Sequence, residues 1–260
     1  MRLSLVASLL LSTLLISAPA SAQQPPARDP QAVALAAATF RILGGGQVDL
    51  SSLNISATAA ARIYHPQGDE LGVLTIKARG LSRVRMDLAV GNQTRTTALS
   101  GKRASMLRGN GTPSQPVSPT IPFRCNLFPL LSPLADYVQN DLSVTYLGVE
   151  FIAGKQAQHI LISSKSPGAA VQRFPQAGEF HIYLDSVSLI PLKAVYFTLS
   201  TRNTAPLYRI EDLYSDYRQV GSILVPFTVE RSLNGHPYAR FSLQSVNTNA
   251  SLSEDDFLLR

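Results

Sequence analysis

Most of this chain alternates apolar and polar residues with a period of two, in short segments separated by turn-forming residues. Leu74 and Ile76 share one face of a predicted strand, and Met86 and Leu88 share one face of the next. Side chains of a strand point alternately to its two faces, so this pattern predicts strands with one apolar and one solvated face. Turn signals such as Asn234-Gly235 favour tight hairpins between consecutive strands.

The second half of the chain repeats this organisation. Strands at this spacing, most of them joined by tight turns, are typical of a single antiparallel sheet. Because few helices are available to cover it, we expect a mainly β protein whose sheet curls into an unclosed β-barrel. The second-half segments of β-forming composition are 143–152, 157–164, 178–185, 192–201, 207–218, 222–232 and 237–247.

Two helices are predicted. Asp29 is suited to cap a helix that starts at Pro30 and ends near Ile42, before three consecutive glycines. A second, shorter helix is expected over 125–139, after a proline-rich loop at 112–124. We expect the apolar face of this central helix to form a lid over the sheet, through Leu127, Leu130, Leu131 and Leu134.

The first 22 residues have the plan of a secretory signal peptide. A single basic residue, Arg2, precedes a short apolar run, and Ala20-Ser21-Ala22 offers small residues for cleavage after Ala22. The alternative to a signal peptide is an N-terminal membrane anchor. The apolar run argues against an anchor, because it is shorter than the roughly 20 apolar residues that a membrane span needs. We therefore expect residues 1–22 to be removed and residues 23–260 to form one exported, periplasmic domain that is not an integral membrane protein.

The sequence contains no recognisable motif for catalysis. The four histidines lack metal-ligand spacing, and neither a nucleophile elbow nor a phosphate-binding loop occurs. The formal net charge of +6 includes no long basic block, which argues against nucleic acid as a partner. We expect no catalytic residue, no metal and no cofactor, and keep an exported hydrolase as an alternative. The histidines are His65, His159, His181 and His236.

The positive signal for function is apolar. One face of the predicted sheet has more apolar surface than two helices can easily cover, and such a sheet is a natural container for acyl chains. Each methylene group moved out of water contributes about 0.8 kcal/mol to binding. For any single residue, a plain filled core is the alternative. The residues expected to line the cavity are Leu74, Ile76, Met86, Leu88, Val195, Phe197, Leu199, Phe227, Val229, Phe241 and Leu243.

Three passages of the last third carry a family resemblance. They are Tyr183-Leu184-Asp185 with Leu189 to Lys193, then Tyr214 to Arg218 with Gly221, Ile223 to Phe227 and Glu230, and finally Asn234-Gly235 to Phe241 with Val246 to Asn249 and Asp256-Phe257. In these passages the chain resembles the bacterial outer-membrane lipoprotein carrier superfamily, over roughly residues 140–260. The resemblance implies an unclosed antiparallel β-barrel with helices as a lid over an apolar cavity. It also implies a protein that carries lipoproteins or lipids across the periplasm, or senses them.

These observations predict a non-catalytic periplasmic protein that binds the acyl chains of lipids or lipoproteins. Membrane-bound donor and acceptor proteins are the expected partners of such a carrier. The alternative is an exported protein-interaction or sensory module on the same fold, with its cavity filled.

Overall fold

The structure is a computed structural model that describes residues 28–44, 46, 52–80, 82–100, 103–109, 111–113, 134, 142–164, 174–199 and 207–259. Most of these residues form strands of one sheet. The strands are β1 (Asn54–Ile63), β2 (Glu70–Arg79), β3 (Arg83–Val90), β4 (Gln93–Ser100), β5 (Arg103–Arg108), β6 (Leu142–Ile152), β7 (Lys155–Ser164), β8 (Glu179–Asp185), β9 (Pro191–Leu199), β10 (Leu207–Val220), β11 (Ile223–Leu233) and β12 (His236–Asn247).

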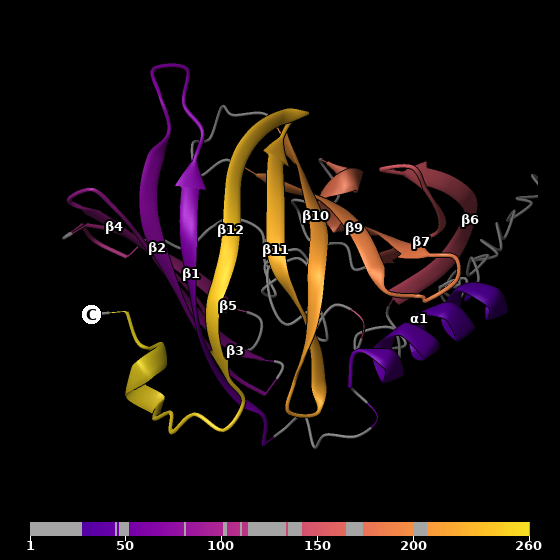
Figure 1. Ribbon diagram of the computed structural model, residues 1–260, viewed down its shortest axis with the longest axis horizontal. Helices are drawn as coiled ribbons and strands as arrows, with labels where there is room; N and C mark the ends of the chain where they lie inside the picture. The colour runs from indigo at the N-terminus through magenta and orange to yellow at the C-terminus, as the bar shows by residue number, and fades with distance from the viewer. Residues whose placement is uncertain are drawn as a thin grey trace, which may run out of the picture.

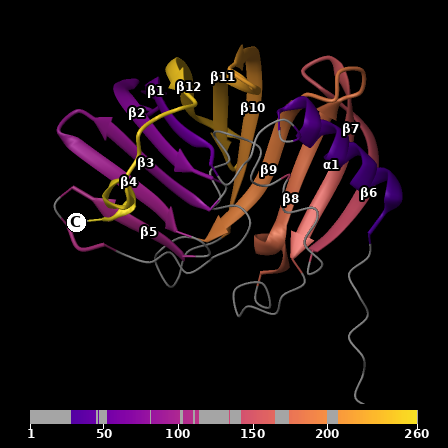
Figure 2. The ribbon, with the colours of Figure 1, turned by 90° about the horizontal axis from the view of Figure 1, so that it is seen from below.

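The sheet has twelve antiparallel strands in the order β5-β4-β3-β2-β1-β12-β11-β10-β9-β8-β7-β6. Because β1 pairs with β12, the first and last strands lie side by side near the middle of the sheet (Figure 1). The strands at the two edges of the sheet, β5 and β6, follow each other along the chain. The sheet is strongly curved and its edges do not meet in the strand pairing (Figure 2). The expected curled, unclosed antiparallel sheet is confirmed, whereas β4 and β5 were not predicted.

Local irregularities accompany the bending. The pairing of β1 with β12 shifts register between Thr58 and Ala59, and such bulges bend a strand and increase its twist. Gly72 of β2 lies so close to the backbone of Ala89 that a Cβ atom at this position would clash with the Ala89 carbonyl oxygen. Glycine therefore permits a close approach of β2 and β3 that another residue would prevent.

The predicted first helix is present as α1 (Pro30–Ile42). The Asp29 carboxylate accepts hydrogen bonds from the backbone N–H groups of Gln31, at 2.8 Å, and Ala32, at 3.3 Å. This satisfies two of the N–H groups that every helix start leaves unpaired. Ala32 and Ala36 are fully buried, so the helix docks onto the core through its small residues.

The main hydrophobic core occupies one face of the sheet, together with α1. Alternate residues of β1, from Ile55 to Ile63, are buried in it. We call this face the inner face and the opposite one the outer face. A second, smaller cluster is separate from the main core and contains Ile152, Ala157, Tyr183 and Val195.

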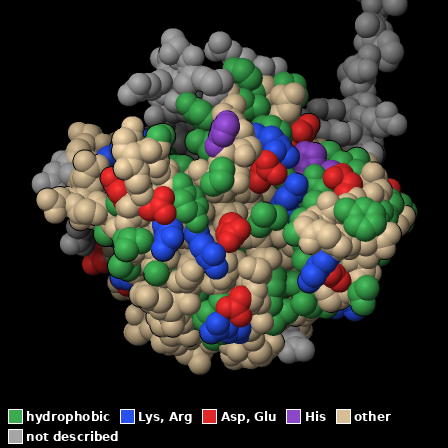
Figure 3. Space-filling view, turned by 45° about the horizontal axis from the view of Figure 1, so that its top comes forward, with side chains coloured by type: hydrophobic (Ala, Val, Ile, Leu, Met, Phe, Trp, Pro, Cys, Tyr) green, Lys and Arg blue, Asp and Glu red, His purple; other side chains and the backbone are tan. Residues whose placement is uncertain are grey.

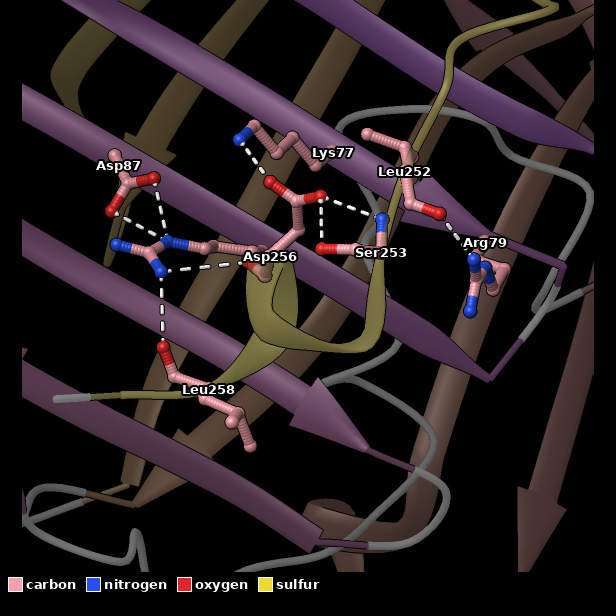
Figure 4. A network of polar contacts seen from close by, with 8 residues as sticks. Lys77, Arg79, Asp87, Leu252, Ser253, Asp256 and Leu258 are labelled. Carbon is pink, nitrogen blue, oxygen red and sulfur yellow. Dashed lines mark hydrogen bonds and ion pairs between the residues drawn. The ribbon is translucent and has the colours of Figure 1, made fainter.

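The C-terminal segment packs against the outer face of β2 and β3 through the short helix η4 (Glu254–Phe257) (Figure 4). Lys77 donates a hydrogen bond to the Asp256 carboxylate at 2.6 Å, and Arg85 donates one to the carbonyl oxygen of Leu258 at 3.0 Å. Phe257, which lies between Asp256 and Leu258 in the sequence, is buried. Among the described residues, no helix is both long and apolar enough to cross a membrane.

Candidate functional site

The inner face brings together eight of the residues that the sequence analysis assigned to a cavity. Leu74, Ile76, Val229 and Phe241 are buried in the main core. The other four are only half-buried and pack against that core from its margin. Whether these side chains hold a ligand stays a prediction. The four at the margin are Met86, Leu88, Phe227 and Leu243.

Strand β9 presents the opposite face from the one expected. Ala194 and Tyr196 belong to the main core, whereas Val195 lies in the second cluster with Tyr183. Because neighbouring side chains of a strand point to opposite faces, Phe197 is on the outer face with Val195. Leu199 occupies a position of the same parity, but its side chain is not described. Val195 and Phe197 are therefore not part of the inner-face site.

The predicted lid is described at one residue. Leu134 is fully buried in the main core, so this residue does contact the inner face. Leu127, Leu130 and Leu131 lie outside the described residues, as do the predicted signal peptide, residues 1–22, and most of the proline-rich segment 112–124. Their roles stay predictions.

A buried ion pair interrupts the apolar inner face. Arg231 of β11 donates to Asp212 of β10 through Nε and Nη2, with both distances 2.7 Å, and Asp212 is fully buried. The Tyr196 hydroxyl lies 2.8 Å from Arg231 and donates to Asp212 at 3.2 Å. Burial opposes the charge of Arg231, but Asp212, Tyr196 and Tyr214 together outweigh burial and hold the pKa of Arg231 above its ordinary value.

Two further arginines lie on the inner face, and sequence reasoning missed both. Arg95 of β4 pairs with Leu88 of β3 on one side and with Arg108 of β5 on the other. Both arginine side chains are exposed. Desolvation by the surrounding protein lowers the pKa of Arg95, Tyr238 opposes this effect, and the charges of Arg108 and Arg231 add to it. Arg108 and Arg231 thus both lie close enough to Arg95 to act on it electrostatically.

The outer face carries a chain of hydrogen bonds across β6, β7 and β8. The His159 ring lies 2.6 Å from Glu150 through Nδ1 and 2.9 Å from His181 through Nε2. His181 in turn lies 3.4 Å from Glu179. Burial is the main cause that lowers the pKa of both histidines, and the glutamates oppose it. Tyr183 stacks on His159, and burial raises the pKa of this tyrosine to about 12.

This arrangement suits a proton better than a metal ion. The His159 and His181 ring centroids are 5.2 Å apart while the two facing nitrogens are 2.9 Å apart, so the nitrogens point almost directly at each other. That is the geometry of a linear N–H···N hydrogen bond, in which a shared metal ion has no room. Among the residues that the structure describes, no three His, Cys, Asp or Glu side chains are grouped as metal ligands.

Charged residues of both signs are mixed on the molecular surface. On the face drawn in Figure 3, basic and acidic side chains lie next to each other and alternate with apolar ones. No extended basic stripe crosses this face. Nucleic-acid binding proteins typically present such a stripe, so this face does not resemble a nucleic-acid interface.

Comparison with solved structures identifies the fold. A LolA superfamily protein from Nitrosomonas europaea superposes with a TM-score of 0.56 at 10% identity, over 88% of this chain and 97% of that one. A domain named for outer-membrane lipoprotein sorting, from Vibrio parahaemolyticus, gives a TM-score of 0.52 at 12% identity, over 85% and 97%. A DUF1329 family protein from Desulfovibrio piger gives 0.53 at 10% identity, over 88% and 96%.

The sequence itself matches no family model and no curated protein. The likeness therefore rests on three-dimensional structure, and it extends over nearly the full length of the compared proteins. The chain has a LolA-like fold.

Proposed function

We propose that this protein is a non-catalytic periplasmic carrier that holds the acyl chain of a lipid or lipoprotein against the inner face of its sheet. The observation that carries the proposal is the apolar margin of that face. Met86, Leu88, Phe227 and Leu243 continue the buried core outward but are themselves only half-buried. An acyl chain lying on them would remove their remaining apolar surface from water, at roughly 25 cal/mol for each Å² buried.

Two further observations support the proposal. The fold is LolA-like, and one compared protein is named for the sorting of outer-membrane lipoproteins. The signal-peptide pattern of residues 1–22 predicts export. Because acylated molecules partition into membranes, a carrier of this kind would receive and release its ligand at membrane-bound donor and acceptor proteins.

The test is to purify the protein from the periplasm without detergent, extract it with organic solvent and identify bound lipids by mass spectrometry. We expect acyl species in near-stoichiometric amount. The delipidated protein should bind a fluorescent fatty acid, and an acylated peptide should displace it while the same peptide without its acyl group should not. A lipid-free protein that also ignores both probes would rule the proposal out.

A protein-interaction module is a second candidate, and one observation favours it. The edge strand β6 exposes Leu147, Val149 and Phe151, with 47%, 45% and 75% of their surface accessible. An extended segment of a partner protein that paired with β6 as a thirteenth strand would cover these side chains. If this is the function, Phe151→Lys will abolish capture of the partner, and filling the inner face with fatty acid will leave capture unchanged.

A further inference from the structure

Arg95 and Arg108 form a cross-strand pair of like charge on the inner face. They are directly opposite each other in the pairing of β4 with β5, and both are exposed. Like charges in this position destabilise a sheet. Within the described part of the chain, neither guanidinium contacts a carboxylate. The pair therefore has two positive charges with no counter-charge from those residues.

A second arginine pair shows how the same geometry looks when it is neutralised. Arg62 of β1 and Arg240 of β12 are also directly opposite each other, but on the outer face. Arg62 lies 3.7 Å from Asp69, and Arg240 lies 3.3 Å from Glu230. Each outer-face arginine thus has its own acid, whereas the inner-face pair has none among the residues that the structure describes.

The inner-face pair stands at the end of an apolar row. The register of consecutive strands places one row of paired residues across the inner face, from β12 to β5. Its first four members are apolar and its last two are arginines. Adjacent strands are about 4.8 Å apart, so the apolar part spans about 14 Å before the charges begin. In order, the row is Leu243, Ala59, Leu74, Leu88, Arg95 and Arg108.

The described neighbours of Arg95 include no group that neutralises its charge. The nearby positive charge of Arg231 is already matched by Asp212, through two hydrogen bonds of 2.7 Å. Tyr238 of β12 is the polar neighbour that favours the charged form of Arg95. A tyrosine hydroxyl and two guanidinium groups are hydrogen-bond donors, so an anion entering this site would find several donors and no competing carboxylate among the described residues.

We propose that Arg95, Arg108 and the Tyr238 hydroxyl bind the anionic head group of an acyl ligand, a carboxylate or a phosphate, whose chain lies along Leu88 and Leu74. This inference rests on the proposed function, because it assigns the polar end of the molecule whose apolar end the inner face would hold. Guanidinium groups match both anions through paired, charge-assisted hydrogen bonds.

The experiment uses three probes with the same twelve-carbon chain: dodecanoate, dodecyl phosphate and dodecanol. Their affinities are measured by displacement of a fluorescent fatty acid from the wild-type protein and from two double variants. Arg95→Gln with Arg108→Gln removes the inner-face pair, and Arg62→Gln with Arg240→Gln removes the matched outer-face pair. Circular dichroism and thermal unfolding establish that each variant is folded.

We expect the wild-type protein to bind one or both anionic probes at least about tenfold more tightly than dodecanol. The Arg95/Arg108 variant should bind all three probes with the affinity of dodecanol, while the Arg62/Arg240 variant keeps the wild-type preference. The anionic probe that loses affinity shows whether the head group is a carboxylate or a phosphate. The ligand-free Arg95/Arg108 variant should also melt at or above the wild-type temperature, because its like-charge repulsion is gone.

The outcomes separate the two proposals. Equal binding of all three probes by the wild-type protein, or an anionic preference that survives in the Arg95/Arg108 variant, overturns the head-group site while acyl-chain binding stands. If none of the probes binds, dodecanol included, the carrier function itself is overturned. If the preference is lost equally in both double variants, the effect is one of overall charge, and the site is likewise rejected.

Discussion

Arg231 and Asp212 form a bidentate ion pair inside the core, and Asp212 has no solvent exposure. Removing one partner leaves the other charge buried without compensation. We predict that Arg231→Met lowers the free energy of unfolding by about 3–5 kcal/mol, measured by urea denaturation. Arg240→Met is the matched control, because Arg240 pairs with Glu230 in solvent, and we predict a loss below about 1 kcal/mol there. Equal losses in the two variants would contradict the prediction.

His159 and His181 should make the protein less stable in mild acid. Burial lowers the pKa of both rings in the folded protein, below the value of about 6.5 for an unfolded chain. The unfolded state therefore binds more protons, and the free energy of unfolding falls as the pH drops below about 6.5. Only one proton fits between the two facing nitrogens, so a second would place two N–H groups against each other.

This pH dependence is measured by urea denaturation at a series of pH values between 5 and 8. The double variant His159→Gln with His181→Gln should show a smaller slope than the wild-type protein. The groups that face or act on the pair are unchanged in the variant: Glu150, Glu179, Tyr183, Lys193 and Arg209. The exposed residues His65 and His236, both replaced by Gln, provide the control, whose slope should equal that of the wild type. An unchanged slope in the His159/His181 variant would refute the assignment.

We expect the Asp256 carboxylate to hold the C-terminal segment against the outer face of β2 and β3. The hydrogen bond from Lys77 is the largest cause that lowers the pKa of Asp256, to about 2, and bonds from Ser253 add to it. Because the pKa is lowered, ionised Asp256 stabilises the folded state at pH values above its ordinary pKa near 4. This stabilisation is lost as the pH falls toward 2. We predict that Asp256→Asn speeds amide exchange in 253–258 at neutral pH, measured by mass spectrometry. Asp69→Asn removes an acid elsewhere and should leave this exchange unchanged.

The two faces of the sheet should respond differently to a buried or half-buried charge. Leu243 lies on the inner face and packs against the core, whereas Leu213 lies on the outer face of β10 with 36% of its surface exposed. We predict that Leu243→Asp weakens binding of a fluorescent fatty acid by at least about tenfold, because a carboxylate in contact with an acyl chain is poorly solvated. Leu213→Asp should bind normally. Binding is compared only where circular dichroism shows both variants folded, and equal binding would place the ligand elsewhere.

The parts of the fold with strong local chemistry are predictable from the sequence. Asp29 and Pro30 mark the start of α1, and the structure begins the helix at Pro30. Asn234-Gly235 predicts the hairpin between β11 and β12, and both residues have positive φ, at 50° and 81°. In each case a side chain or a backbone preference acts within a few residues, so one sequence suffices.

The errors come from features that depend on distant residues. Strand β9 is apolar on both faces, because Ala194 and Tyr196 join the main core while Val195 packs in the second cluster. Alternation alone does not say which face is inner. The sequence analysis also missed the basic pair, because Arg95 and Arg108 become neighbours only through the register of β4 and β5. Because arginine occupies an inner-face position in each of those two strands, β4 and β5 lack the alternation of apolar and polar residues by which the sequence analysis recognised strands.

The pairing of β1 with β12 has a consequence for when the molecule can fold. Residues 54–63 obtain their second neighbouring strand from residues 236–247, so the ribosome must synthesise both segments, and all the chain between them, before the sheet can be completed. Contacts between such distant segments form slowly. Until residues 236–247 have been synthesised, β1 lacks one of its two partner strands, and the pairing that joins the two halves of the sheet cannot form.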